Sequence, residues 1–283
     1  MPIIDCHQHL IYPEAFSYSW TQGIPQLAGR AFTLEAYHRA LGDRREEVRT
    51  LFMESAVDDP DGRGEGRHVE QLAGREGSGI IGWVLNCRPE AEGDFRAYLE
   101  AVRHTKLVGL RRILHVVPDD TSRHPRFAAN LALLAEYRLS FDLCLLSRQL
   151  PLALPLVDQC QGVRFILDHC GNPPLGTPEF ARWREDLKEL SRRPNVACKV
   201  SGIVNHCPGG EVRADVLRPC LEHVLDCFGW DRVLWGSDWP VVEMVSTLQA
   251  WLDITFELLE GESAENQAKI LHLNAERLYP GQG

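Results

Sequence analysis

The amino-acid sequence predicts an α/β protein, a (β/α)8 TIM barrel formed as a single domain over residues 1–283. Two observations carry this prediction. Short apolar runs alternate with amphipathic stretches, and eight such pairs follow one another along the chain. Most of these runs are apolar at nearly every position, which is typical of parallel strands covered on both faces. A closed barrel is the simplest arrangement of eight such units, and an open doubly wound sheet is the competing architecture.

The predicted strands are short and rich in aliphatic residues, and the first begins almost at the N-terminus. Each is separated from the next by enough residues for one helix. The eight strands are predicted at Ile3–His9 (with its turn), Val48–Glu54, Gly79–Asn86, Leu107–Leu114, Leu139–Leu145, Val163–Asp168, Val196–Val200 and Arg232–Gly236.

The stretches between the strands carry helix signals. Thr33 is placed to cap the first helix, with Glu35 in its first turn. The Gly- and Asp-rich run Asp58–Gly66 predicts a loop before a short helix near His68–Glu76. Apolar residues at helical spacing predict the later helices, among them Phe95, Leu99 and Val102, then Phe127, Leu131 and Leu134, then Leu150–Cys160, then Phe180, Trp183, Leu187 and Leu190, then Leu221, Val224, Leu225 and Phe228, and the closing pair Val241–Leu259 and Ala264–Leu278.

The composition excludes several classes of function. The net charge is −10 and no basic run is present, so nucleic acid and anionic membranes are poor partners. No apolar run approaches the roughly 18–20 residues that span a bilayer, and we see no N-terminal export signal. The nine cysteines form no Cys-x-x-Cys pair, which indicates reduced thiols in a cytoplasmic protein.

Polar and charged side chains gather where the predicted strands end. In a barrel, these ends meet on one face, which is where active sites of this fold lie. Two of the histidines are two positions apart, so a strand would point both to the same side. The strand-end residues are His7 and His9, Glu54, Arg111, Arg112 and His115, Asp168 and His169, Lys199 and Ser201, and Ser237 and Asp238.

Four short motifs resemble the amidohydrolase superfamily. They are Asp5-x-His7-x-His9, Ile166-Leu167-Asp168-His169-Cys170-Gly171, Cys198-Lys199-x-Ser201-Gly202 and Trp235-Gly236-Ser237-Asp238-Trp239-Pro240. Together with Gly109–Arg112 and Phe228–Arg232, they are similar to its sugar-lactonase branch, which includes L-fuconolactonase, L-rhamnonolactonase and 2-pyrone-4,6-dicarboxylate lactonase. The resemblance runs from Ile3 to Tyr279.

The resemblance implies a hydrolase that opens a sugar-acid or carboxylated lactone with water. Asp238 is the expected general base, because ester hydrolysis needs a carboxylate within reach of the attacking water. His7, His9 and His169 are expected to polarise the lactone carbonyl.

Five further residues are expected to bind substrate. Arg112 is the first choice for a substrate carboxylate or hydroxyl, since a guanidinium offers a bidentate fork. His115 and Lys199 are alternatives for the same work, although Lys199 is equally well explained by pairing with an acidic neighbour. Trp20 lies in the aromatic loop Leu10–Ala31, where it would stack on a sugar ring, and Glu54 ends the second strand.

The sequence argues against a two-metal centre. Binuclear members of the superfamily need a bridging lysine or carboxylate after the fourth strand and a further histidine after the fifth. Here those places hold Arg111–His115 and Asp142–Leu146, which do not supply both. His7, His9, His169 and Asp238 would suit one Zn²⁺, so the expectation is either no required cofactor or a single divalent ion.

Two other functions stay open on the sequence alone. A zinc-dependent decarboxylase, or another mononuclear hydrolase of the superfamily, would use the same four residues with tightly held metal. A non-catalytic barrel is disfavoured because all four residues are present. The expected partner is a small-molecule lactone, with neither nucleic acid nor membrane, and the fold is compatible with a homo-oligomer.

Overall fold

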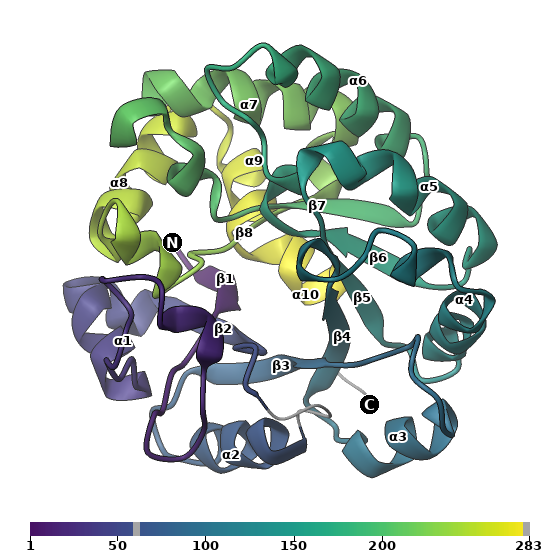
Figure 1. The fold of residues 1–283 in the computed structure, drawn as a ribbon. Coiled ribbons are helices and arrows are strands. Elements are labelled where there is room, and N and C mark those ends of the chain that lie inside the picture. Colours follow the sequence, from purple (N-terminus) through teal and green to yellow (C-terminus); the bar gives the residue numbers. More distant parts are fainter. Residues whose placement is uncertain (59–62, 280–283) are drawn as a thin grey trace.

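The computed structural model describes residues 1–58 and 63–279 and is an eight-stranded barrel. All strands are parallel and follow one another in chain order, and the helices surround them (Figure 1). The predicted TIM barrel is therefore confirmed. The strands are β1 Ile3–Gln8, β2 Val48–Met53, β3 Ile80–Asn86, β4 Leu107–Ile113, β5 Ser140–Cys144, β6 Arg164–Leu167, β7 Val196–Val200 and β8 Val233–Trp235.

The ring closes through the segment that follows β8. A parallel bridge joins Gln8 to Trp239, the His9 amide donates to the Trp239 carbonyl at 2.8 Å, and the Asp238 amide donates to the His7 carbonyl at 2.8 Å. These backbone bonds alternate between the two segments as they do in a parallel ladder. Closure therefore places the strand-end residues of β1 directly beside Asp238.

The helices lie outside the barrel, except at the end formed by the amino ends of the strands. Thr33 caps the first as predicted, its hydroxyl accepting the Ala36 amide at 3.3 Å. At the other end of the chain, α10 (Asn274–Leu278) covers the amino ends of the strands, where Arg164 donates to the Leu278 carbonyl at 2.8 Å. The helices are α1 Leu34–Leu41, α2 Arg63–Ala73, α3 Phe95–Val102, α4 Pro125–Ala132, α5 Leu150–Gln159, α6 Glu179–Ser191, α7 Ala214–Phe228, α8 Leu248–Leu258, α9 Ala264–Ala268 and α10 Asn274–Leu278.

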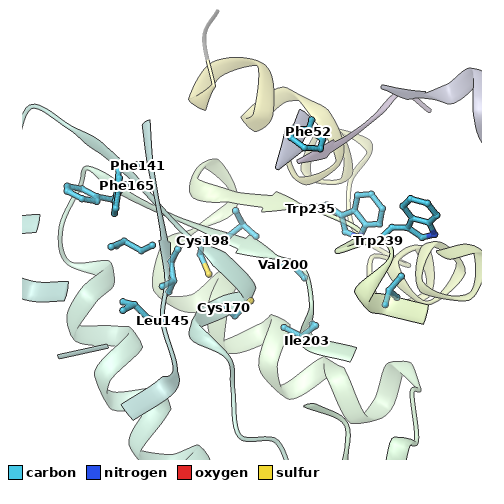
Figure 2. Close-up of a cluster of buried hydrophobic side chains, with 14 of the residues drawn as sticks. Phe52, Phe141, Leu145, Phe165, Cys170, Cys198, Val200, Ile203, Trp235 and Trp239 are labelled. Carbon is cyan, nitrogen blue, oxygen red and sulfur yellow. The ribbon is translucent and has the colours of Figure 1, made fainter. Parts of the chain in front are cut away.

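The apolar core has an outer and an inner part. The outer part fills the space between strands and helices and includes Phe141, Phe165 and Trp235, with Cys170 and Cys198 among them (Figure 2). The inner part lies inside the barrel, where small and aliphatic strand residues meet the C-terminal segment. It contains Ile4, Cys6, Leu51, Met53, Val84, Val108, Ile166, Ala197, Leu234, Ala275, Leu278 and Tyr279. This packing closes the amino end and leaves the carboxyl end open for a site.

Three predicted helical segments differ from the structure by more than their end residues. Helix α2 begins at Arg63, inside the predicted loop Asp58–Gly66, of which residues 59–62 lie outside the described part of the chain. The predicted helix Val241–Leu259 is a short 3-10 turn followed by α8, with Thr247 as the N-cap. The predicted helix Ala264–Leu278 is divided by a π-helical segment at Lys269–Leu273. None of the helices in the described residues is long and apolar enough to cross a membrane.

Candidate active site

A cavity of about 560 Å³ opens at the carboxyl ends of the strands. Three of the four predicted catalytic residues line it directly: His9, His169 and Asp238. The fourth, His7, is fully buried just behind them, with its ring 4.8 Å from that of His9 and 4.5 Å from that of His169. The barrel therefore brings together side chains from the ends of β1, β6 and β8.

Asp238 faces both histidines of the first strand. Its Oδ1 lies 3.5 Å from His9 Nε2 and 3.7 Å from His7 Nε2. Burial raises the pKa of this carboxyl, but the surrounding imidazoles, His169 first among them, outweigh that effect and lower the pKa to about 2. Asp238 is therefore ionised at neutral pH and able to accept a proton.

One backbone contact sets the protonation of His9. Its Nδ1 lies 3.0 Å from the Met53 carbonyl oxygen, and a carbonyl can only accept a hydrogen bond. Nδ1 therefore carries the proton, and in the neutral ring Nε2 presents a lone pair toward Asp238. Two acceptors then face each other across 3.5 Å, an arrangement that favours a proton, a water or a cation between them.

His7 is held between two cations and a carboxylate. Arg111 Nη1 lies 3.2 Å from His7 Nε2, while Lys199 Nζ and Asp168 Oδ1 both lie 3.3 Å from Nδ1. Burial lowers the pKa of His7 well below its usual value. The carboxylate of Asp168 opposes this shift, while Lys199 and His169 add to it. His7 is therefore neutral, and its ring is fixed by its neighbours.

A buried ionic cluster lies beneath the histidines. Lys199 Nζ donates to Asp142 Oδ2 at 2.6 Å and to Asp168 Oδ1 at 2.9 Å. Tyr279, from the C-terminal segment, donates to the same Asp142 oxygen at 2.6 Å. Burial raises the pKa of Asp142 to about 7, although Lys199 works against this rise. Because each group has an opposite charge or a donor beside it, the cluster can remain inside the barrel.

The backbone around the cavity is strained. Ala56, His169, Asn172 and Asp238 line the cavity and have positive φ angles of 52°, 54°, 54° and 58°. Such angles cost non-glycine residues energy and concentrate at functional sites. At Gly202 the chain passes so close to the site that a Cβ would lie 2.6 Å from His169 Nδ1. The strained turns aim His169 and Asp238 into the same space.

The predicted substrate-binding residues separate into three groups. His115 and Trp20 line the cavity. Glu54 and Lys199 are fully buried within the ionic network below it, where Glu54 accepts from Arg111 Nε at 2.6 Å. The structure places Arg112 away from the cavity-lining residues, with its Nη2 2.6 Å from Glu90 Oε1, so its position does not favour the substrate contact expected from the sequence.

Arg111, and not Arg112, lies at the cavity wall. The two arginines are neighbours on β4, and side chains of adjacent strand residues point to opposite faces. Arg111 points into the barrel and contributes to the cavity wall. The register of β3 against β4 shifts between Trp83 and Val84, an irregularity that sequence periodicity does not reveal.

Sequence reasoning also missed three loop residues that line the cavity. Asn172 follows β6, and Asn205 and His206 follow β7. His206 Nε2 lies 2.8 Å from Asn172 Oδ1, so the two loops are joined at the cavity wall. Asn172 follows the Asp168–Gly171 run directly, which is the signal that could have identified it; Asn205 and His206 lie in a loop without a distinctive pattern.

The four predicted ligands fit a single divalent ion by donor type. The ligand atoms of His7, His9 and Asp238 lie within 4.8 Å of one another, as do those of His7, Asp168 and His169. Imidazole nitrogens and one carboxylate are the ligands that Zn²⁺ accepts. The lone pair of His9 Nε2 and the ionised Asp238 face the same point, which is the strongest sign of a place for a cation.

Comparison with known proteins places the chain in a family. A sequence model for amidohydrolases matches residues 4–281. The chain belongs to the amidohydrolase family. This confirms the resemblance found in the sequence motifs, and the protein is accordingly an enzyme of the hydrolase class.

Two curated relatives of this amidohydrolase are L-fucono-1,5-lactonases. The one from Burkholderia multivorans is 30% identical over 270 residues, covering 88% of each chain, and the one from Burkholderia ambifaria is 28% identical over 265 residues, covering 88% of this chain and 85% of the relative. A solved amidohydrolase structure from Burkholderia multivorans with bound zinc is 27% identical, has a TM-score of 0.83, and covers 99% of this chain and 100% of its own.

Proposed function

We propose that this amidohydrolase is a lactonase that hydrolyses an uncharged sugar-acid lactone, with Asp238 as the general base. One observation carries the proposal: the ionised Asp238 carboxylate at the cavity wall lies 3.5 Å from His9 Nε2, the nitrogen that has no proton when His9 is neutral, because Nδ1 donates to Met53. Both groups accept hydrogen bonds, so together they can orient the two hydrogens of an attacking water.

The remaining polar groups suit the other steps of ester hydrolysis. His169 Nδ1 lies 2.9 Å from Ser201 Oγ; when the hydroxyl donates, His169 keeps its proton on Nε2 and can donate to the lactone carbonyl. Asp238 takes the proton from water as the oxygen attacks the carbonyl carbon. The protonated Asp238 then returns that proton to the ring oxygen as the ester bond breaks, giving the open hydroxy acid.

A divalent ion held by His9, Asp238 and a second histidine would polarise the carbonyl and acidify the water when bound. The proton transfers between water, Asp238 and the ring oxygen do not require this ion. Asp238 accepts and returns the proton, and the Met53 carbonyl keeps the His9 lone pair directed at the water.

The cavity wall favours a neutral substrate over a dicarboxylate. Among the described residues that line it, Arg111 is the single lysine or arginine side chain, and its charge is already paired with Glu54 at 2.6 Å. Asp58 and Asp238 add negative charge to the wall. Trp20, anchored by its indole N–H to the Ser55 carbonyl at 2.9 Å, offers a flat apolar face to a sugar ring. The L-fucono-1,5-lactonase relatives support the same substrate class.

A pH-indicator assay tests the proposal. We expect rapid acid release from one or more neutral aldonolactones and little from 2-pyrone-4,6-dicarboxylate, with and without a strong chelator. Preference for the dicarboxylate would contradict the assigned substrate class. Acid release from none of the lactones, together with carbon dioxide evolution from a carboxylated aromatic acid, would replace the lactonase by the decarboxylase alternative.

A further inference from the structure

The Arg111 guanidinium occupies the centre of the site without being free to bind an external anion. Its Nε donates to Glu54 Oε1 at 2.6 Å, and its Nη2 donates to the Glu54 carbonyl at 2.8 Å. Its Nη1 lies 3.2 Å from His7 Nε2 and 3.5 Å from Asp168 Oδ2. The side chain is only 4% exposed, so these contacts fix its position.

Arg111 determines which electron pair of His7 remains available. A guanidinium has donors and no acceptor, so the contact with Nη1 requires that His7 Nε2 is the acceptor. The proton of His7 is then on Nδ1, where Asp168 Oδ1 lies 3.3 Å away to receive it. Lys199 Nζ also lies 3.3 Å from Nδ1, but its two shorter hydrogen bonds, at 2.6 and 2.9 Å, go to buried carboxylates, so we assign Nδ1 as the donor to Asp168. The same Nε2 lone pair faces Asp238. A metal ion held by both His7 and Asp238 would therefore need this lone pair.

A metal ion and Arg111 therefore compete for one atom. A zinc–nitrogen bond of about 2.0–2.1 Å uses the lone pair that accepts the Nη1 proton. The fixed positive charge of the guanidinium would also lie close to any divalent ion on that nitrogen, and the two cations would repel each other.

We propose that Arg111 sets the metal affinity of the site, by holding His7 Nε2 as a hydrogen-bond acceptor and lowering the affinity of the His7, His9 and Asp238 cluster for divalent cations. Arg111 is a positioning residue in this account, and its effect passes through His7. The inference rests on the site assigned in the proposed function, but it does not depend on which reaction the site performs.

The charges around Arg111 predict the effect of removing it. Lys199 and Arg111 are the two cations in contact with the carboxylates beneath the histidines. Without Arg111, the lone pair of His7 is free and the negative charge of Asp168 is less compensated. Both changes favour a bound divalent cation.

The test is calorimetric titration of the chelator-treated, metal-free enzyme with Zn²⁺, using an Arg111→Met variant. We expect the variant to bind zinc roughly 10- to 100-fold more tightly than the wild-type protein does. This is the free energy of about one charge-assisted hydrogen bond, which the metal no longer has to break. Arg112→Met is the matched control, because that neighbouring side chain pairs with Glu90 outside the cavity, and it should leave the zinc affinity unchanged.

A second pair of variants guards against misfolding and indirect effects. Glu54→Gln combined with Arg111→Met avoids leaving a buried carboxylate without its partner and should show the same gain. Adding His7→Ala to Arg111→Met should abolish the gain, because the freed lone pair is then missing. Unchanged or weaker zinc binding in both Arg111 variants would overturn the proposal, as would a gain that persists without His7. Titration involves no turnover, so it stays informative even if every lactone proves inert.

Discussion

His9 illustrates how a single contact decides what a site residue can do. The sequence predicted that His7, His9 and His169 would act alike on a carbonyl. In the structure, His9 Nδ1 faces the Met53 carbonyl, His7 Nε2 faces the Arg111 guanidinium, and His169 Nδ1 faces the Ser201 hydroxyl. Three histidines that look equivalent in the sequence therefore have three different hydrogen-bonding states.

A substitution at Ser201 tests whether its hydroxyl sets the role of His169. Replacing Ser201 with alanine removes the partner of His169 Nδ1, so the proton is no longer directed to Nε2. We expect kcat to fall about 10-fold while KM changes little, as is usual for groups that orient a catalytic histidine. Steady-state kinetics on the best lactone measure both constants.

The control for this variant is Ser140→Ala. Ser140, the first residue of β5, is likewise buried and donates to the Val108 carbonyl at 3.2 Å, but it does not line the cavity. Its loss should leave kcat within about twofold. Equal losses in the two variants would show that Ser201 contributes only to packing.

The sequence predicts which residues lie at the strand ends better than it predicts which way their side chains point. The strand-end motifs predict a site of His7, His9, His169 and Asp238, and these four residues lie together. Which of Arg111 and Arg112 faces the cavity depends on a register shift between β3 and β4. No local pattern in the sequence encodes that shift.

Helix α2 shows how one element supports a segment that lines the cavity, the residues directly after β2. Glu65, in its first turn, is buried, and its Oε1 accepts the Ser55 amide at 2.8 Å. Burial and the nearby Glu54 raise the pKa of Glu65 to about 8. The folded protein therefore keeps a proton here that the unfolded chain releases near its ordinary value of 4.5.

This shift predicts a pH-dependent loss of stability. The contribution of Glu65 is complete below about pH 4.5 and declines as the pH rises toward 8, because the folded state binds more protons than the unfolded state in that window. Glu65→Gln should remove this slope and raise the free energy of unfolding at pH 8 by roughly 1 to 3 kcal/mol. Denaturant titrations at pH 5 and pH 8 measure it, and an identical pH slope in both proteins would refute the assignment.

The elements themselves follow from periodicity with few exceptions. Strand β7 begins and ends where predicted, because its run is uniformly apolar apart from Lys199. The differences arise where local signals are weak: α2 starts among glycines at Arg63, and residues 241–247 are apolar enough to suggest helix but form a 3-10 turn and an extended cap. The site depends on strand ends, which were the best-predicted boundaries.

At the scale of the whole molecule, the end of the chain completes the interior of the barrel. Tyr279 packs among the inner aliphatic residues and donates to Asp142, which in turn holds Lys199 beneath His7. The first strand and the last residues described are therefore linked through one buried network. No local sequence pattern indicates this link, because the two ends of the chain meet only in the closed barrel.

Tyr279→Phe tests the link. The variant keeps the ring but leaves Asp142 without one of its two donors, so we expect the free energy of unfolding to fall by about 1 to 2 kcal/mol. Tyr137→Phe, which removes an exposed hydroxyl bonded to Glu100, should have a smaller effect. Chemical denaturation of both variants gives the comparison, and equal stabilities would contradict a structural role for the Tyr279 hydroxyl.

The central claim, that Asp238 is the base of a lactone hydrolase, has one direct measurement. Asparagine tolerates the positive φ at this position, so Asp238→Asn should fold normally, as thermal unfolding will verify. We predict that acid release from the best neutral aldonolactone falls by about 10²- to 10⁴-fold in this variant, while exposed Asp253→Asn retains the full rate. An Asp238→Asn enzyme that turns over at the wild-type rate would contradict the account.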